Sequence, residues 1–253
     1  DMYQKLVKAG AVGFISIAGS PLDEGVDLIP RAYGLPKNLP GEEKKAAGKE
    51  AQNYDNRIPG VSIHYKDAIE LVTKGASQAC LVVEQETVTR TSRNVVAQIE
   101  GTDKAEEILT LTAHYDSVQE GPGAYDNMSG GAIIMELCRY FQAHRPRRTM
   151  EFIWFGAEEK GLLGSQSYIK VHESELSAHR FNMNVDLAGQ LVGGTVVGVT
   201  GDASICNMIT YMAHEIGIGM STKNQIWGSD SNTFAWKGIP AMTLNRDGFG
   251  MHT

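Results

Sequence analysis

The chain has 253 residues, with 23 lysines and arginines against 30 aspartates and glutamates, which gives a formal net charge of −7. This acidic balance argues against a nucleic-acid-binding module, which needs a basic surface to neutralise phosphates. No apolar run approaches the ~18 residues of a membrane-spanning helix, and the three widely spaced cysteines form neither a disulfide framework nor a metal motif. Hydrophobic residues make up 42% of the chain, so the composition predicts one or two folded domains with a hydrophobic core.

Residues 1–84 form a first predicted domain with short and widely spaced elements. Its sequence pattern predicts a helix at 2–9, strands at 11–17 and 79–88, and a strand followed by a helix within 58–75. The intervening residues 20–56 are polar and contain four prolines. The chain begins at Asp1 in a segment that already has a helical pattern, so we expect a partial or processed chain without a visible targeting signal.

Residues 85–253 alternate between strand and helix patterns. Strands are predicted at 108–113, 150–155, 181–185, 194–199 and 239–244, and helices at 129–143, 162–171 and 204–216. The run MEFIWF at 150–155 is almost entirely apolar, which is typical of a parallel strand buried on both faces. This alternation predicts an α/β domain with a mostly parallel central sheet covered by helices on both sides.

Histidines and acidic residues follow the ends of these predicted strands. His114 comes directly after the first strand of the second domain, Glu158–Glu159 after the second, and Asp186 after the third. His252 lies in the glycine-rich loop after the last strand, and Asp126 lies in the glycine-rich loop before the first long helix. Because ligands bind at the carboxyl ends of the strands in an open parallel sheet, we expect these side chains to meet in one cleft.

The chemistry of this set predicts a metal centre. Four carboxylates in one cleft would repel one another without a cation. Histidine nitrogens with carboxylate oxygens, and no thiolate, suit zinc in a catalytic site. Two zinc ions fit the charges, because their +4 balances three ligating carboxylates and one hydroxide and leaves one acid free to act as a base.

Five ordered motifs carry a resemblance to a known family: HYD at 114–116, GAYDNMSGGA at 123–132, FGAEEKGLLGS at 155–165, NVDLAG at 184–189 and the terminal MHT. Over about residues 86–253 the chain resembles the co-catalytic zinc aminopeptidases. That family includes bacterial leucyl aminopeptidases and, more distantly, glutamate carboxypeptidase. The resemblance implies a three-layer α/β/α fold, two zinc ions per catalytic domain, and hydrolysis of amino-terminal residues from peptides.

The same resemblance implies a role for each residue of the predicted cleft. His114 and Asp186 would bind one zinc ion, Glu159 and His252 would bind the other, and Asp126 would bridge the two.

Two further residues take part in the implied reaction without binding metal. Glu158 would act as the general base, taking a proton from a zinc-bridging water and passing it to the leaving amine. Asp116 would accept the other N–H group of the His114 imidazole and orient it.

Several loop residues are predicted to line a substrate pocket: Tyr125, Trp227, Asp230 and Phe249. Tyr125 also departs from the family, because many members have a second aspartate just before the bridging one. The remaining histidines are expected at the surface: His64, His144, His172, His179 and His214.

Two expectations concern the ends of the chain. Residues 1–84 are similar to the latter part of a protease-associated domain, chiefly through the strand and helix pattern of 58–75. This domain and the family imply a secreted or otherwise extracytoplasmic enzyme. The family continues through a closing helix after the last ligand, so we expect the chain to be truncated at its C-terminus and His252 to be weakly anchored.

Three alternatives to an aminopeptidase remain open. A glutaminyl cyclase-like acyltransferase of the same fold would hold a single zinc ion. A carboxypeptidase would need basic groups near the metals to hold the substrate carboxylate, for which Arg246 is the obvious loop candidate. A non-catalytic binding module would hydrolyse nothing. For an aminopeptidase, the expected partners are peptide substrates. The sequence does not indicate the oligomeric state.

Overall fold

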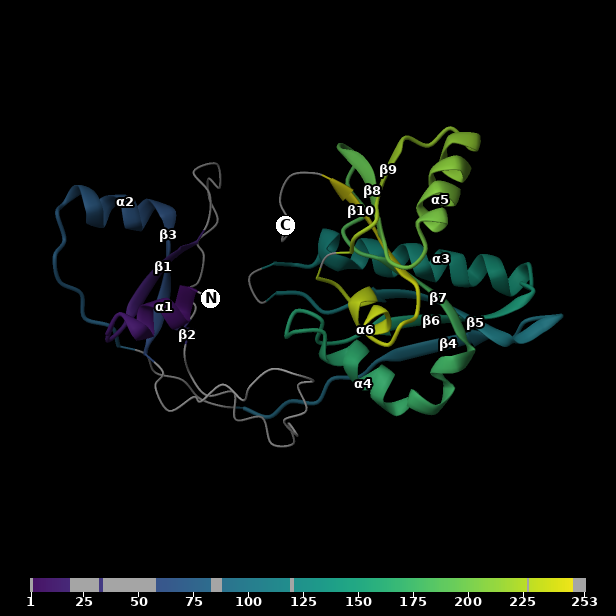
Figure 1. The fold of residues 1–253 in the computed structure, drawn as a ribbon, viewed down its shortest axis with the longest axis horizontal. Coiled ribbons are helices and arrows are strands. Elements are labelled where there is room, and N and C mark those ends of the chain that lie inside the picture. The colour runs from purple at the N-terminus through teal and green to yellow at the C-terminus, as the bar shows by residue number, and fades with distance from the viewer. Residues whose placement is uncertain are drawn as a thin grey trace. The chain divides into compact units, whose positions relative to one another are not determined.

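The computed structural model describes residues 2–18, 32–33, 58–82, 88–118, 121–226 and 228–247. It divides the chain into two compact units, Asp1–Thr89 and Arg90–Thr253 (Figure 1). The predicted boundary lies at 84/85. None of the helices in the described residues is long and apolar enough to cross a membrane.

The first unit contains two helices and a small sheet. The elements are α1 (Met2–Lys8), β1 (Phe14–Ala18), β2 (Ala32–Tyr33), β3 (Gly60–His64) and α2 (Tyr65–Thr73), and the strand order is β1-β3-β2. The strand–helix pair predicted within 58–75 is confirmed, and His64 caps α2 by accepting the Lys66 N–H. The strand predicted at 79–88 is wrong for its described residues, 79–82 and Val88, which belong to no strand. Most of the polar segment 20–56 lies outside the described residues.

The second unit is built on a seven-stranded sheet with the order β4-β6-β5-β7-β10-β8-β9. Its strands are β4 (Val95–Ile99), β5 (Lys104–His114), β6 (Arg148–Phe155), β7 (His179–Val185), β8 (Gly194–Val199), β9 (Met220–Lys223) and β10 (Ala241–Asp247). The four central strands, β6, β5, β7 and β10, run parallel. β4 is antiparallel to β6, and β8 is antiparallel to β10. The prediction of a mostly parallel sheet is confirmed, whereas β4 and β9 are strands that the sequence pattern did not predict.

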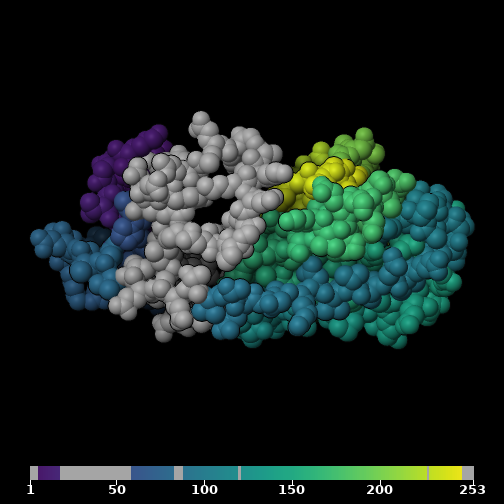
Figure 2. Space-filling view, turned by 90° about the horizontal axis from the view of Figure 1, so that it is seen from below, coloured from purple at the N-terminus to yellow at the C-terminus, as the bar shows by residue number. Residues whose placement is uncertain are grey.

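Helices cover both faces of this sheet (Figure 1). The helical elements are η2 (Ala124–Met128), α3 (Ser129–Ala143), α4 (Leu163–Val171), η3 (Glu173–Ala178), α5 (Ala203–Glu215) and α6 (Ser231–Ala235). In the space-filling view of Figure 2, the early residues of the second unit, in blue, pack directly against its middle residues, in green. α6 was not predicted, because its five residues are too few to show a helical period.

The face under α3 is apolar. Ile134 of α3 packs on Phe152 of β6 and Ala113 of β5, and all three are fully buried. Successive residues of a strand point to opposite faces, so Ile153 and Phe155 of β6 face the other layer. There they pack with residues of α4 and α6: Tyr168, Ile169 and Phe234. β6 is therefore buried on both faces, as its apolar run predicts.

A buried polar cluster lies on the α4 and α6 side of the sheet. Glu151 of β6, Tyr168 of α4 and His179 of β7 are each at least nine-tenths buried. The Tyr168 hydroxyl donates to Glu151, and it lies 3.3 Å from His179 Nε2. Burial opposes ionisation of Glu151, but His179 and Tyr168 outweigh it and lower the pKa of that carboxyl. The expectation that His179 lies at the surface is wrong, because Glu151 and Tyr168 supply the partners that a buried imidazole needs.

Candidate metal centre

The site begins at the carboxyl end of β5, where the sheet places His114. Tyr115 donates its N–H to Phe155 O at 2.9 Å, which ties the end of β5 to the end of β6. The His114 side chain is almost completely buried. Its Nδ1 atom lies 3.0 Å from the backbone oxygen of Asp116. Nε2, on the other side of the ring, therefore faces the carboxylates of the site.

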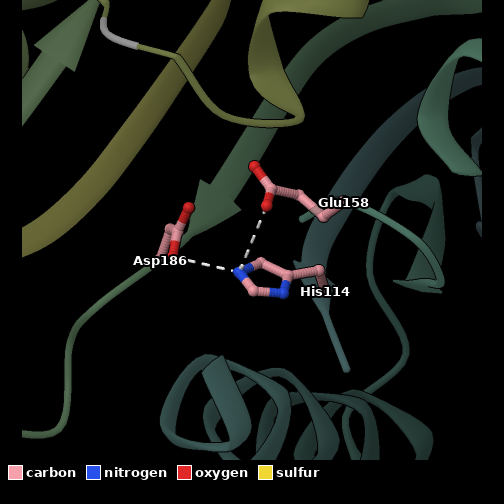
Figure 3. Close-up of side chains that lie close together, drawn as sticks. All are labelled: His114, Glu158 and Asp186. Atoms are coloured by element: carbon pink, nitrogen blue, oxygen red, sulfur yellow. Dashed lines mark ion pairs between the residues drawn. The ribbon is translucent and has the colours of Figure 1, made fainter. Parts of the chain in front are cut away.

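Three carboxylates from separate segments converge on His114 Nε2. Asp126 Oδ1 of η2 lies 3.0 Å away, Asp186 Oδ1, just after β7, lies 3.5 Å away, and Glu158 Oε2, after β6, lies 3.9 Å away. Figure 3 shows Glu158 and Asp186 approaching the same ring nitrogen from two sides. Ligand atoms of His114, Glu158 and Asp186 all lie within 4.8 Å of one another, which is close enough to share an ion.

The electrostatics of this group favour a bound cation. Burial alone would lower the pKa of His114, but the nearby carboxylates of Asp116, Asp126 and Asp186 raise it well above its ordinary value. Burial raises the pKa of Glu158 to about 8, and the nearby carboxylates add to the rise although His114 opposes it. Both pKa values are raised because the site holds more negative charge than its own groups balance. Nitrogen and oxygen donors without a thiolate fit catalytic zinc.

Asp116 holds the backbone that carries the two glutamates. Its Oδ1 accepts the N–H of Glu158 at 2.9 Å, and its Oδ2 accepts the N–H of Glu159 at 3.2 Å. Burial opposes ionisation of Asp116, but His114 and these N–H groups outweigh it and lower its pKa. The Asp116 carboxylate lies 3.6 Å from His114 Nδ1, farther than its own backbone oxygen. The contact expected between Asp116 and the imidazole is thus made through the main chain, and the carboxylate anchors the Glu158 loop.

Asn127 holds the Asp126 segment against the end of β7. Its Nδ2 donates to Val185 O at 2.9 Å, and its Oδ1 accepts the N–H groups of Gly130 and Leu187 at 3.1 and 3.3 Å. These bonds reach the residues on either side of Asp186. One fully buried amide therefore fixes the spacing between two carboxylates of the site.

Comparison with known proteins places this geometry in a family. The model of peptidase family M28 matches residues 94–252, which is more than half of the chain. The chain belongs to peptidase family M28. It is 37% identical over 134 residues to aminopeptidase YwaD of Bacillus subtilis, covering 52% of this chain and 29% of that protein. It is 29% identical over 252 residues to a probable leucine aminopeptidase 2 of Trichophyton verrucosum, covering 93% of this chain and 49% of that protein.

Solved structures agree with this assignment. A zinc aminopeptidase from Bacillus subtilis superposes with a TM-score of 0.61 at 27% identity, covering 77% of this chain and 49% of that one. The chain therefore spans less than half the length of each of these three relatives.

Not all predicted residues of the M28 domain can be placed. His114, Asp126, Asp186 and Glu158 lie together, and the Glu159 backbone is held beside them by Asp116. The predicted zinc ligand His252 lies outside the described residues, as do the predicted pocket residues Trp227 and Phe249.

Two of the predicted pocket residues, Asp230 and Tyr125, lie within the described residues. Asp230 is fully buried, and burial raises its pKa to about 7, although the Ser165 hydroxyl and His114 lower it. The Tyr125 hydroxyl lies 2.8 Å from Leu187 O and 2.9 Å from Arg246 O, so it joins backbone segments.

Arg246, expected in a loop as the cation for carboxylate binding, instead lies in β10. The Arg246 guanidinium donates to the backbone oxygens of Leu191 and Val192, both at 3.3 Å. This arrangement gives no support to the carboxypeptidase alternative.

The structure adds two polar residues to the site that the sequence analysis did not single out. Ser229 donates its hydroxyl to Asp186 Oδ2 at 2.6 Å, and Asn184 Nδ2 donates to Ser229 Oγ at the same distance. The alternation of Asn182 and Asn184 in β7 with Asp186 just after it is the signal that could have found Asn184, because polar residues at every second position of a buried strand need partners.

Proposed function

We propose that the chain carries the catalytic centre of a zinc-dependent aminopeptidase that removes amino-terminal residues from peptides. The single observation that carries this proposal is the convergence of Asp126, Asp186 and Glu158 on His114 Nε2 in a domain of peptidase family M28. Burying this many carboxylates together is costly unless a cation compensates their charge.

Five residues would hold two zinc ions. His114, Asp126 and Asp186 are already gathered, whereas the parts of Glu159 and His252 rest on the family resemblance. Bound zinc would supply an activated water molecule and polarise the scissile carbonyl. The protein itself positions the donor atoms: hydrogen bonds of Asn127 and Asp116 hold the segments that carry Asp126 and Glu158 in the absence of an ion.

Glu158 is the proposed general base. Its carboxyl sits 3.9 Å from His114 Nε2, at the edge of the donor group, and its backbone N–H is fixed by Asp116. Its pKa is raised to about 8 in the metal-free site, and bound cations would lower it again, so that the carboxylate would be ionised and able to accept a proton. From this position Glu158 would take the proton of the attacking water and deliver it to the leaving amine, a role typically worth ~10²–10⁴-fold in rate.

Metal analysis joined to a restoration assay tests this function. The chain is stripped with a chelator, titrated with zinc, and assayed on aminoacyl-arylamides with free and with blocked amino groups. We expect hydrolysis that returns with about two zinc ions per chain and requires the free amine. Zinc-independent hydrolysis, or none on any substrate, would overturn the proposal. Cyclisation of amino-terminal glutamine with about one zinc ion would favour the glutaminyl cyclase alternative.

An extracytoplasmic location is the corresponding proposal for where the enzyme acts. It is supported by the resemblance of residues 1–84 to a protease-associated domain. Fractionation of cells that express the native gene tests it, and recovery of the protein in the cytosol would contradict it.

A further inference from the structure

A line of buried polar side chains runs between β5 and β7 toward the site. The parallel register pairs Thr110 with Asn182 and Thr112 with Asn184. All four residues are at most 1% exposed. Because side chains alternate along a strand, Thr112 lies on the same face as His114, and Asn184 on the same face as Asp186. The line therefore belongs to the face of the sheet that carries the proposed zinc ligands.

The hydrogen bonds in this line all point the same way. Asn182 Nδ2 donates to Thr112 Oγ1 at 3.1 Å, and Thr112 Oγ1 donates to Asn184 Oδ1 at 2.8 Å. Asn184 Nδ2 then donates to Ser229 Oγ, and Ser229 Oγ donates to Asp186 Oδ2, both at 2.6 Å. Thr112, Asn184 and Ser229 each accept from the group before them and donate to the group after them. The last acceptor is a carboxylate.

The donor direction of these hydrogen bonds determines which acceptor the Ser229 hydroxyl can donate to. A hydroxyl has one hydrogen to give, and Ser229 has two neighbours to which it could give it. Since Asn184 presents its N–H to Ser229 Oγ, the hydroxyl hydrogen is left for Asp186 Oδ2. Asn184 presents that N–H only while its carbonyl oxygen is taken by Thr112. With the amide reversed, Ser229 would donate to Asn184 and the Asp186 carboxylate would lose its donor.

We propose that Asn184 and Thr112 are positioning residues that direct the Ser229 hydroxyl onto Asp186 Oδ2 and so keep Asp186 Oδ1 aimed at the metal centre. Oδ1 is the atom that faces His114 Nε2 at 3.5 Å. The inference rests on the proposed zinc site and extends it across two strands. Outer partners of this kind typically change metal affinity about 10- to 100-fold when they are removed.

A purely structural role is the competing explanation, and the chain offers a matched pair to separate the two. Thr110 and Thr112 lie two residues apart on β5, are both fully buried, and both accept from Asn182 Nδ2. Only Thr112 continues toward Asp186. Thr110→Val and Thr112→Val therefore remove the same hydroxyl from similar surroundings, one outside the hydrogen bonds that lead to Asp186 and one within them.

The test measures zinc affinity by competition with a chromogenic chelator, together with thermal unfolding of the metal-free chain. We expect Thr112→Val to weaken zinc binding about 10-fold or more, and Thr110→Val to leave it within about 2-fold at a similar loss of melting temperature. Thr112→Ser should restore the affinity, because it returns the hydroxyl. Asn184→Asp, which replaces the N–H donor by an acceptor of the same shape, should weaken binding at least as much as Thr112→Val.

Equal zinc affinities for Thr110→Val and Thr112→Val would overturn the proposal, whether both are weakened or neither is. The unaltered chain separates this failure from that of the proposed function. If it binds zinc and Thr112→Val binds equally well, only the positioning role is lost. If it binds no zinc, the proposed function is lost, and the positioning role with it.

Discussion

The two faces of the central sheet use the same strands for different purposes. On β5, Leu111 and Ala113 face the apolar layer under α3, whereas Thr112 and His114 face the side of α4 and α6. β7 repeats this pattern, with Val185 on the apolar face and polar residues on the other. The comparison shows how a period of two lets one buried strand serve both a hydrophobic core and a chemical site.

The polar face has a cost that the apolar face does not. A buried polar group without a partner destabilises a fold by ~1–3 kcal/mol, so the polar face holds together only where its groups satisfy one another. Glu151, Tyr168 and His179 do so within their own cluster. The line from Asn182 ends instead on Asp186, and the carboxylates around His114 stay in excess. The part of the face that lacks internal balance is the part where the proposed reaction would occur.

The largest expected effect on the polar face comes from Glu158→Gln. Activity should fall about 10²- to 10⁴-fold, because glutamine cannot accept the proton, while the fold and zinc content persist. Steady-state hydrolysis and metal analysis measure both. The control is Glu100→Gln, which makes the same change at an exposed side chain and should leave the rate unchanged. A Glu158→Gln rate close to that of the unaltered chain would refute the role as base.

The apolar face should respond in the opposite way. Phe152→Ala empties a fully buried position under α3 and should cost about 3–5 kcal/mol of unfolding free energy. Zinc affinity per folded molecule should not change, because Phe152 packs on the α3 face of the sheet, opposite the face that carries His114. Denaturant unfolding and chelator competition test both parts. Ile134→Val, a smaller change in the same cluster, should cost about 0.5–1.5 kcal/mol, and exposed Val96→Ala should cost little. A loss of zinc affinity in Phe152→Ala would break the division between the faces.

The sequence predicts the parts of the fold that depend on apolar periodicity. The helix at 129–143 and the strand at 194–199 match α3 and β8 at both ends. The antiparallel pairing of β8 with β10 could not be predicted, because register depends on partners distant in the sequence. α6 is too short for a pattern, yet it begins two residues after Ser229, whose hydroxyl donates to Asp186.

The site was predictable where side chains follow strand ends. His114 and Asp186 are found where the end of a parallel strand places them. The burial of Asp230 and the engagement of the Tyr125 hydroxyl could not be predicted, because they depend on which loops meet. The charge of Glu151 within an apolar run was visible in the sequence, but its partners Tyr168 and His179 come from other elements.

The excess charge of the polar face predicts a pH-dependent stability without metal. The pKa of Glu158 is about 8 and that of Asp230 about 7 in the folded chain, both above the ordinary values of 4.5 and 3.8. The folded state then binds protons more tightly than the unfolded state. The metal-free chain should lose stability as pH rises from about 5 to about 8, at about 1.4 kcal/mol per unit of pKa shift as an upper bound. Saturating zinc should flatten this dependence, because a cation favours the ionised carboxyls.

Calorimetry of the metal-free and zinc-loaded chain between pH 5 and 9 measures this effect. Glu158→Gln should remove part of the fall without zinc. A melting temperature that rises over this range in the metal-free chain would contradict the assignment of excess negative charge to this face.

The smallest expected effect is that of Tyr125→Phe, which tests whether the loops of the polar face are tied together from outside the sheet. The hydroxyl lies within hydrogen-bond distance of Leu187 O and Arg246 O, so its loss should cost about 1 kcal/mol. Because Tyr125 precedes Asp126 and Leu187 follows Asp186, two proposed zinc ligands would lose a common anchor, and zinc affinity should fall a few-fold. Exposed Tyr140→Phe on α3 is the matched control and should change neither quantity. If Tyr125→Phe loses stability but keeps full zinc affinity, Asn127 alone sets the spacing of the two carboxylates. If zinc affinity falls as far as in Thr112→Val, the outer loops position Asp186 as strongly as the line within the sheet.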